Sequence, residues 1–157
     1  MGWYDCHLHS FDVGGIEFGP PDTDGWGREI KSEKQHTLER LVGEKDKFEY
    51  VYDFGDSWVH QIVVEKVTSD QLVAPRCIAG ARACPPEDCG GVYGYAEVVA
   101  AFLDDKHERH AEIAEWVPVD WSPEQFDLEL ADRLVAKHRP QPGRPRASKS
   151  KTPRARA

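Results

Sequence analysis

The sequence lacks the segments that would place a protein in or across a membrane. It has no run of about eighteen or more apolar residues, which is the minimum for a helix that spans a bilayer. It also lacks a basic start followed by an apolar stretch and a small-residue cleavage site, which a secretory signal needs. We therefore predict a cytoplasmic protein without a membrane partner.

Cysteine is scarce, and its spacing does not match a standard metal motif. The chain has four cysteines, at positions 6, 77, 84 and 89. In an intracellular protein they are expected to be free, redox-active or metal-bound rather than joined in disulfides. The gaps between Cys77, Cys84 and Cys89 differ from the short repeated spacing of a closed structural zinc site. We treat all four as thiols.

Acidic residues are absent from the C-terminal segment, 139–157, which carries seven Lys or Arg and four Pro. Such a segment buries too little apolar surface to offset its ordering entropy, so we predict a folded domain over 1–138 and a disordered basic tail over 139–157. The tail can hold nucleic acid through its charges or serve as a solubilising extension, and the extension is the favoured interpretation. The nucleic-acid candidates are Arg144, Arg146, Lys149, Lys151, Arg154 and Arg156.

Two segments alternate with the period of a β-strand. Residues 47–67 predict a hairpin with Gly55 and Asp56 as a two-residue loop, which places Asp53 diagonal to His60. An Asp beside a His is usually a structural polar pair, but it can also orient the imidazole for catalysis or metal binding. The aromatic residues expected on one face are Phe48, Tyr50, Tyr52 and Phe54.

A second hairpin is predicted near the N-terminus, with a turn at Gly14 and Gly15. In this register His7 and His9 point to the same side, so both can reach one metal ion. The alternative is that the two histidines pack against Trp3 or hydrogen-bond to a loop carbonyl. This alternative is favoured because no third ligand follows at a fixed spacing.

Helical periodicity appears at Leu38–Val42, with Thr37 as cap, and again beyond Gly91. A helix is expected around Tyr95–Phe102 and a second from about Lys106 to Val117. A third should start at Ser122–Pro123. Its buried stripe is expected to be Leu128, Ala131, Leu134 and Val135. Strands followed by helices predict an α+β fold, in which a mainly antiparallel sheet of hairpins has the C-terminal helices packed on one face.

The segment "CIAGARACPPEDCGG", 77–91, is too rich in turn-forming residues for a helix or strand. Its prolines and glycines predict a stiff loop that displays Glu87 and Asp88 at its tip. A mixed metal site could combine Cys77 or Cys84 with a histidine, for which the candidates are His7, His9 and His60. Alternatively, the two cysteines are small buried residues and the carboxylates cap the helix that follows.

Four blocks of the sequence carry a family resemblance: "MGWYDCHLHSF", "YVYDFGDSWVHQIVVE", "PRCIAGARACPPEDCGGVYGY" and "FDLELADRLV". Over residues 1 to about 136 the chain resembles the plasmid pRi ORF-three-like family, whose members are often labelled transposon-passenger or TnpR-family proteins. The resemblance implies a small α+β domain of mobile elements, plasmids and bacterial chromosomes. No serine or tyrosine recombinase pattern accompanies the label. Family members usually begin with a further strand and helix, so the chain is expected to lack that segment and Met1 to be an internal start.

Three functions remain open. The favoured one is a non-enzymatic accessory or interaction domain, associated with plasmids or mobile elements, whose acidic face and aromatic hairpin bind a protein partner. The second is a metal-dependent hydrolytic enzyme, with zinc as its cofactor, in which His60 is base or ligand, Asp53 or Asp56 orients it, and Glu87 or Asp88 completes the site. The third is DNA binding through the tail, because the formal charge of the body, near −15, opposes contact with phosphates.

Overall fold

The computed structural model describes residues 2–21, 29–68 and 74–138. Its sheet has five strands, in the order β3-β2-β1-β4-β5, and only the β2–β3 pair is parallel. The strands are β1 (His9–Val13), β2 (Ile16–Gly19), β3 (Lys31–Ser32), β4 (Lys47–Tyr52) and β5 (Trp58–Val63). The predicted α+β fold with a mainly antiparallel sheet is confirmed.

The N-terminal hairpin forms as the sequence predicts. Phe11 of β1 lies opposite Phe18 of β2, and the connecting Gly14 and Gly15 both have positive φ, at 63° and 80°. A two-residue turn of this kind requires positive φ at both positions, which glycine adopts without steric cost. β1 begins only at His9, however, so His7 lies before the strand and does not share a face with His9 through strand alternation.

The predicted register of the second hairpin is wrong by one residue. Tyr52 lies opposite Trp58 and Tyr50 opposite His60, so the loop is longer than two residues. Asp53 leaves the strand with a φ of 56°, and the Ser57 amide bonds to its carbonyl at 2.6 Å. This left-handed turn after Tyr52 takes the place of the expected Gly55–Asp56 loop, and it removes Asp53 from the sheet.

The aromatic face of the hairpin is covered by the protein's own chain. Phe48 and Tyr52 are buried, and Trp58 is half-buried. The indole of Trp3 stacks on the Tyr52 ring with centroids 4.8 Å apart and lies edge-on to His60 at 5.5 Å. These rings are core contacts of the domain, so they do not offer the exposed aromatic surface that we expected a protein partner to bind.

A short 3-10 helix, η1 (Glu33–Gln35), and the helix α1 (Leu38–Leu41) lie over the β1–β2 end of the same face. The predicted helix at Leu38–Val42 is confirmed with Thr37 at its N-cap, although the threonine side chain makes no capping bond. The His36 ring lies against Phe18, with centroids 4.9 Å apart, and so joins this segment to the sheet.

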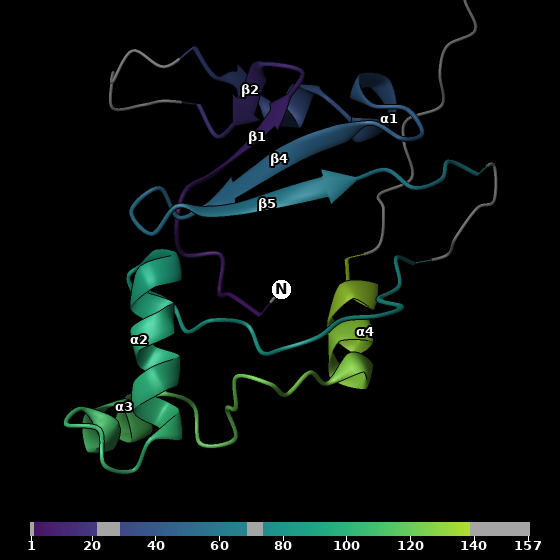
Figure 1. The fold of residues 1–157 in the computed structure, drawn as a ribbon. Helices are drawn as coiled ribbons and strands as arrows, with labels where there is room; N and C mark the ends of the chain where they lie inside the picture. The colour runs from purple at the N-terminus through teal and green to yellow at the C-terminus, as the bar shows by residue number, and fades with distance from the viewer. Residues whose placement is uncertain (1, 22–28, 69–73, 139–157) are drawn as a thin grey trace, which may run out of the picture.

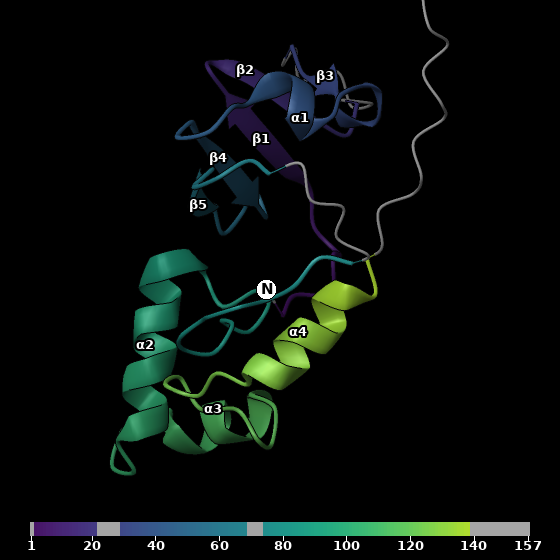
Figure 2. The same ribbon diagram turned by 90° about the vertical axis from the view of Figure 1, so that its right-hand side faces the viewer.

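Three C-terminal helices form a second layer: α2 (Gly91–Leu103), α3 (His110–Trp116) and α4 (Leu128–Ala136). In both views they lie on one side of the sheet, and the N-terminal segment runs between the two layers (Figures 1 and 2). Trp58 of β5 meets Tyr95 of α2 with ring centroids 6.2 Å apart, which connects the layers. The buried helical cluster consists of Cys89, Val98, Ala101, Ile113 and Val117.

The predicted start of the last helix is wrong. The carbonyl of Pro123 accepts the Ala83 amide at 3.0 Å, so it is diverted from helical pairing, and residues 122–125 form a single turn. α4 starts at Leu128, where the Asp127 side chain accepts the Leu130 amide at 2.8 Å as an N-cap.

The predicted buried stripe of this helix is also wrong. α4 has no buried residue, and its members Leu128 and Leu134 are each 41% exposed. Polar contacts hold the helix instead, because Asp132 receives the Arg76 guanidinium at 2.6 Å and the Cys77 amide at 2.9 Å. Among the described residues, no helix has the length and apolar character needed to cross a membrane.

Candidate metal centre

Three chain segments converge between the sheet and the helices: the N-terminal bend at residues 5–8, the β4–β5 loop and the proline loop before α2. Two tryptophans hold the proline loop in place. The indole N–H of Trp3 bonds to the Pro85 carbonyl at 2.9 Å, and that of Trp121 bonds to the Cys84 carbonyl at 3.0 Å. Prolines also stiffen this loop, so its carboxylates are presented from a fixed backbone.

His7 lies at the centre of this convergence. Its Nε2 atom is 3.3 Å from Asp88 Oδ1, 3.8 Å from Asp53 Oδ2 and 3.9 Å from Glu87 Oε2. The Nε2 atom is buried and has no hydrogen-bond partner among the described residues. Buried polar atoms are rarely left without a hydrogen bond, so a metal ion held between this atom and the carboxylates would satisfy it.

Asp53 is held by the loop that displaced it from β4. Its amide bonds to the Leu8 carbonyl at 2.9 Å, and its Oδ1 accepts the Gly55 amide at 2.9 Å. The other oxygen, Oδ2, is thereby left facing His7. The residue is buried, and Asp is one of the few side chains that tolerate its left-handed backbone.

Glu87 is anchored from two directions. Its Oε1 accepts the Tyr4 amide at 2.7 Å and the Tyr52 hydroxyl at 3.1 Å. The same hydroxyl accepts the Cys6 amide at 3.2 Å, so Tyr52 joins the sheet to both the N-terminal bend and the proline loop. Burial, followed by the side-chain hydrogen bonds to the Cys6 thiol and the Glu87 carboxylate, raises the pKa of Tyr52 well above its usual value. Tyr52 therefore stays a neutral donor at physiological pH.

Asp88 opens the cluster to solvent. Its side chain is 74% exposed, whereas that of Glu87 is 14% exposed and that of Asp53 is 10% exposed. Asp88 also has a positive φ, 56°, as do Asp53 and Asp5 beside the cluster. Left-handed backbone at non-glycine residues is uncommon and gathers at functional sites, which agrees with a specialised role for this corner.

The donors suit a divalent metal ion. Two sets of three residues bring their donor atoms within 4.8 Å of one another, namely Cys6, His7 and Glu87, and His7, Asp53 and Asp88. Ligands at about 2.1 Å in a tetrahedral site lie about 3.4 Å apart, close to the separations around Nε2. Among the described residues, each ion pair made by the three carboxylates is with His7. Within the described part of the chain, no lysine or arginine forms an ion pair with these carboxylates.

The structure brings together four of the residues singled out in the sequence: His7, Asp53, Glu87 and Asp88. It also adds Cys6, which we did not predict as a ligand. The only local signal for Cys6 is its position next to His7. Neighbouring residues in an extended chain point in opposite directions, so their adjacency alone does not predict a shared site.

Three other candidates lie elsewhere. His60 Nδ1 is 3.1 Å from the Tyr50 carbonyl, and its ring packs against Trp3. His9 Nε2 pairs with Glu33 at 3.0 Å. The Asp56 carboxylate accepts a hydrogen bond from the Gly90 amide at 3.0 Å, just before α2. Asp56 therefore has the position at the start of this helix that we had considered for Glu87 or Asp88.

The two cysteine candidates are likewise outside the cluster. The Cys77 backbone is tied to Asp132 of α4. Cys84 is half-buried against Gly2, and this burial raises the pKa of its thiol. The six basic candidates for nucleic acid lie in residues 139–157, outside the described residues, so these candidates and the predicted disorder of that segment stay predictions.

Comparison with known proteins identifies the family. The family model described as plasmid pRiA4b ORF-3-like protein matches residues 1–130, most of the chain. The chain belongs to this family. The predicted family is thereby confirmed. The matched residues contain the first three sequence blocks in full, and these include every residue of the His7 cluster.

Two similar proteins are themselves uncharacterised. The "Uncharacterized protein y4hQ" of Sinorhizobium fredii (strain NBRC 101917 / NGR234) is 39% identical over 119 residues, which is 74% of this chain and 61% of that protein. The chain therefore spans less than two thirds of that relative's length. A crystal structure of the "Protein of Unknown Function MM3350" from Methanosarcina mazei Go1 is 34% identical with a TM-score of 0.70, and the match covers 82% of this chain and 75% of that one. Neither name states an activity.

Proposed function

We propose that this protein is a metal-binding domain that holds one divalent transition-metal ion, with zinc as the first candidate, on His7 and the carboxylates beside it, with Glu87 in one set of donors and Asp53 and Asp88 in the other. The observation that carries the proposal is the buried, unpaired Nε2 of His7 surrounded by three carboxylates. Among the described residues this atom makes no hydrogen bond, although Asp88 Oδ1 lies 3.3 Å away.

The bound ion would also join segments that are far apart in the sequence. His7 comes from the N-terminal bend, Asp53 from the β4–β5 loop, and Glu87 and Asp88 from the proline loop. A ligand that binds only the folded chain stabilises it by RT ln(1 + [L]/Kd), which is about 2.7 kcal/mol at a hundredfold excess over Kd. Metal binding and stability are therefore expected to rise together.

The test is zinc titration of chelator-treated protein by calorimetry, together with metal analysis. The wild type should bind one zinc ion per chain, and His7→Ala should weaken the affinity by more than about 100-fold, because even loss of an outer-shell partner costs 10–100-fold. The matched control is His138→Ala, since His138 is exposed at the end of α4. No zinc binding by the wild type, or equal affinity in His7→Ala, would overturn the proposal.

Hydrolysis at the same ion is a second candidate function, favoured by the exposure of Asp88. An ion that reaches solvent can keep a water ligand, and zinc lowers the pKa of such a water to about 7. Turnover of nitrophenyl carboxylate and phosphate esters should require both zinc and His7. Stoichiometric zinc without turnover of either ester class would leave metal binding in place and count against hydrolysis of these classes.

A further inference from the structure

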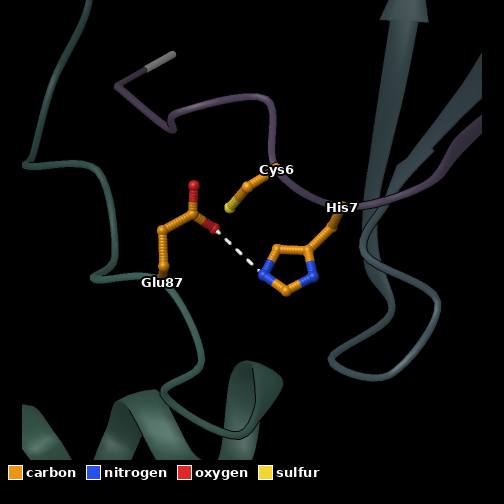
Figure 3. Close-up of side chains that lie close together, drawn as sticks. All are labelled: Cys6, His7 and Glu87. Atoms are coloured by element: carbon orange, nitrogen blue, oxygen red, sulfur yellow. Dashed lines mark ion pairs between the residues drawn. The ribbon is translucent and has the colours of Figure 1, made fainter.

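The Cys6 thiol faces the same carboxylate as the His7 imidazole. The sulfur of Cys6, a ring nitrogen of His7 and a carboxylate oxygen of Glu87 all lie within 4.8 Å of one another. Figure 3 shows the two neighbouring side chains, from the N-terminal segment, directed toward Glu87 of the proline loop. Cys6 is exposed, so an ion arriving from solvent can reach it.

This arrangement requires a specific bend of the backbone. In an extended chain the side chains of residues 6 and 7 would project to opposite sides. Here the chain bends at Asp5, whose φ is 58°, and again at His7. The two bends turn the thiol and the imidazole toward one point.

Hydrogen bonds fix the bend from both sides. The Tyr4 amide bonds to Glu87 at 2.7 Å, and the Cys6 amide bonds to the Tyr52 hydroxyl at 3.2 Å. Tyr52 is buried, so it provides a rigid support. The backbone of Cys6 is therefore anchored, and its sulfur lies 3.8 Å from the Tyr52 hydroxyl.

We propose that Cys6 is a thiolate ligand of the bound ion, so that the site selects borderline metals such as zinc and cobalt(II) over magnesium, calcium and manganese(II). Hard cations prefer oxygen ligands, whereas thiolate and imidazole favour zinc and its neighbours. On binding, the thiol releases its proton to the buffer and the sulfur lone pair coordinates the ion. This inference rests on the metal site proposed above and names the class of ion it takes.

The test is cobalt(II) substitution followed by electronic absorption. A thiolate ligand produces a sulfur-to-cobalt charge-transfer band, so the wild type should show the band and Cys6→Ser should lose it. Cys77→Ser is the matched control, because Cys77 is a half-buried thiol held near α4, and it should keep the band. Zinc affinity should fall by about tenfold or more in Cys6→Ser, while manganese affinity should change little.

The outcomes separate the two proposals. Cobalt bound by the wild type without a charge-transfer band would overturn the role of Cys6 and leave the metal site standing. Neither cobalt nor zinc bound by the wild type would overturn both. The outcome that overturns the role of Cys6 is read in the wild type, so it does not depend on whether Cys6→Ser folds.

Discussion

Tyr52 is the residue whose removal should most clearly separate the sheet from the two segments that it anchors. Its hydroxyl donates to the Glu87 carboxylate at 3.1 Å and accepts the Cys6 amide at 3.2 Å, and its side chain is only 2% exposed. Tyr52→Phe keeps the ring and its stacking on Trp3 while deleting both hydrogen bonds. A bond to a charged group contributes about 1.5–3 kcal/mol and a neutral one about 0.5–1.5 kcal/mol.

We therefore expect Tyr52→Phe to lower the free energy of unfolding by about 2–4 kcal/mol. Urea denaturation should show a lower midpoint with an unchanged slope, and Tm should fall by about 10 °C. The control is Tyr93→Phe, because Tyr93 is 90% exposed, and it should change stability by less than about 0.5 kcal/mol. A Tyr52→Phe midpoint equal to that of the wild type would show that these two bonds do not hold the segments together.

The same substitution has a second expected effect at the metal centre. Glu87 loses the donor that orients its carboxylate, and the Cys6 backbone loses its support. Loss of an outer-shell partner typically weakens metal affinity by 10–100-fold, so zinc binding by Tyr52→Phe should fall within about that range. An unchanged affinity would mean that the carboxylate and the thiol are positioned by their other contacts alone.

Two further predictions concern the helical layer and the tail. Burial first, and then the charge of Asp56, raises the pKa of Cys89 from 9.0 to about 11. Because the folded-state pKa lies above the unfolded one, the neutral thiol stabilises the folded protein below pH 9. This contribution to the free energy of unfolding should be lost between about pH 9 and 11. Between these pH values, the denaturation midpoint should fall less steeply with pH for Cys89→Ala than for Cys77→Ala. Identical pH dependence in the two variants would refute the buried Cys89 thiol as the source of the loss in stability. Any salt-sensitive DNA binding of the full chain, measured by fluorescence anisotropy, should be lost when residues 139–157 are deleted, because the remaining body is strongly acidic. Binding that survives the deletion would place the contact in the body.

Local patterns correctly predicted most of the secondary structure. The alternation of Phe48, Tyr50 and Tyr52 identified the inner face of β4, and Gly14–Gly15 identified the first turn. These features depend on neighbouring residues, whose steric preferences act within a few positions of the chain. The errors arose where a distant group competed with a local signal. The predicted start at Ser122 is a single turn whose Pro123 carbonyl accepts the distant Ala83 amide, and α4 starts only at Leu128.

The sequence by itself determined the α+β class, the hairpins, the stiff proline loop and the residue types available for a metal ion, because short-range periodicity and side-chain chemistry suffice for these. Only the tertiary structure decided which residues meet. It paired His7 with Asp53, Glu87 and Asp88, added Cys6, and left His9 and His60 with other partners. Such convergence depends on bends at Asp5 and Asp53 and on bonds between segments more than forty residues apart, such as that from the Cys6 amide to the Tyr52 hydroxyl. No local pattern in the sequence specifies them.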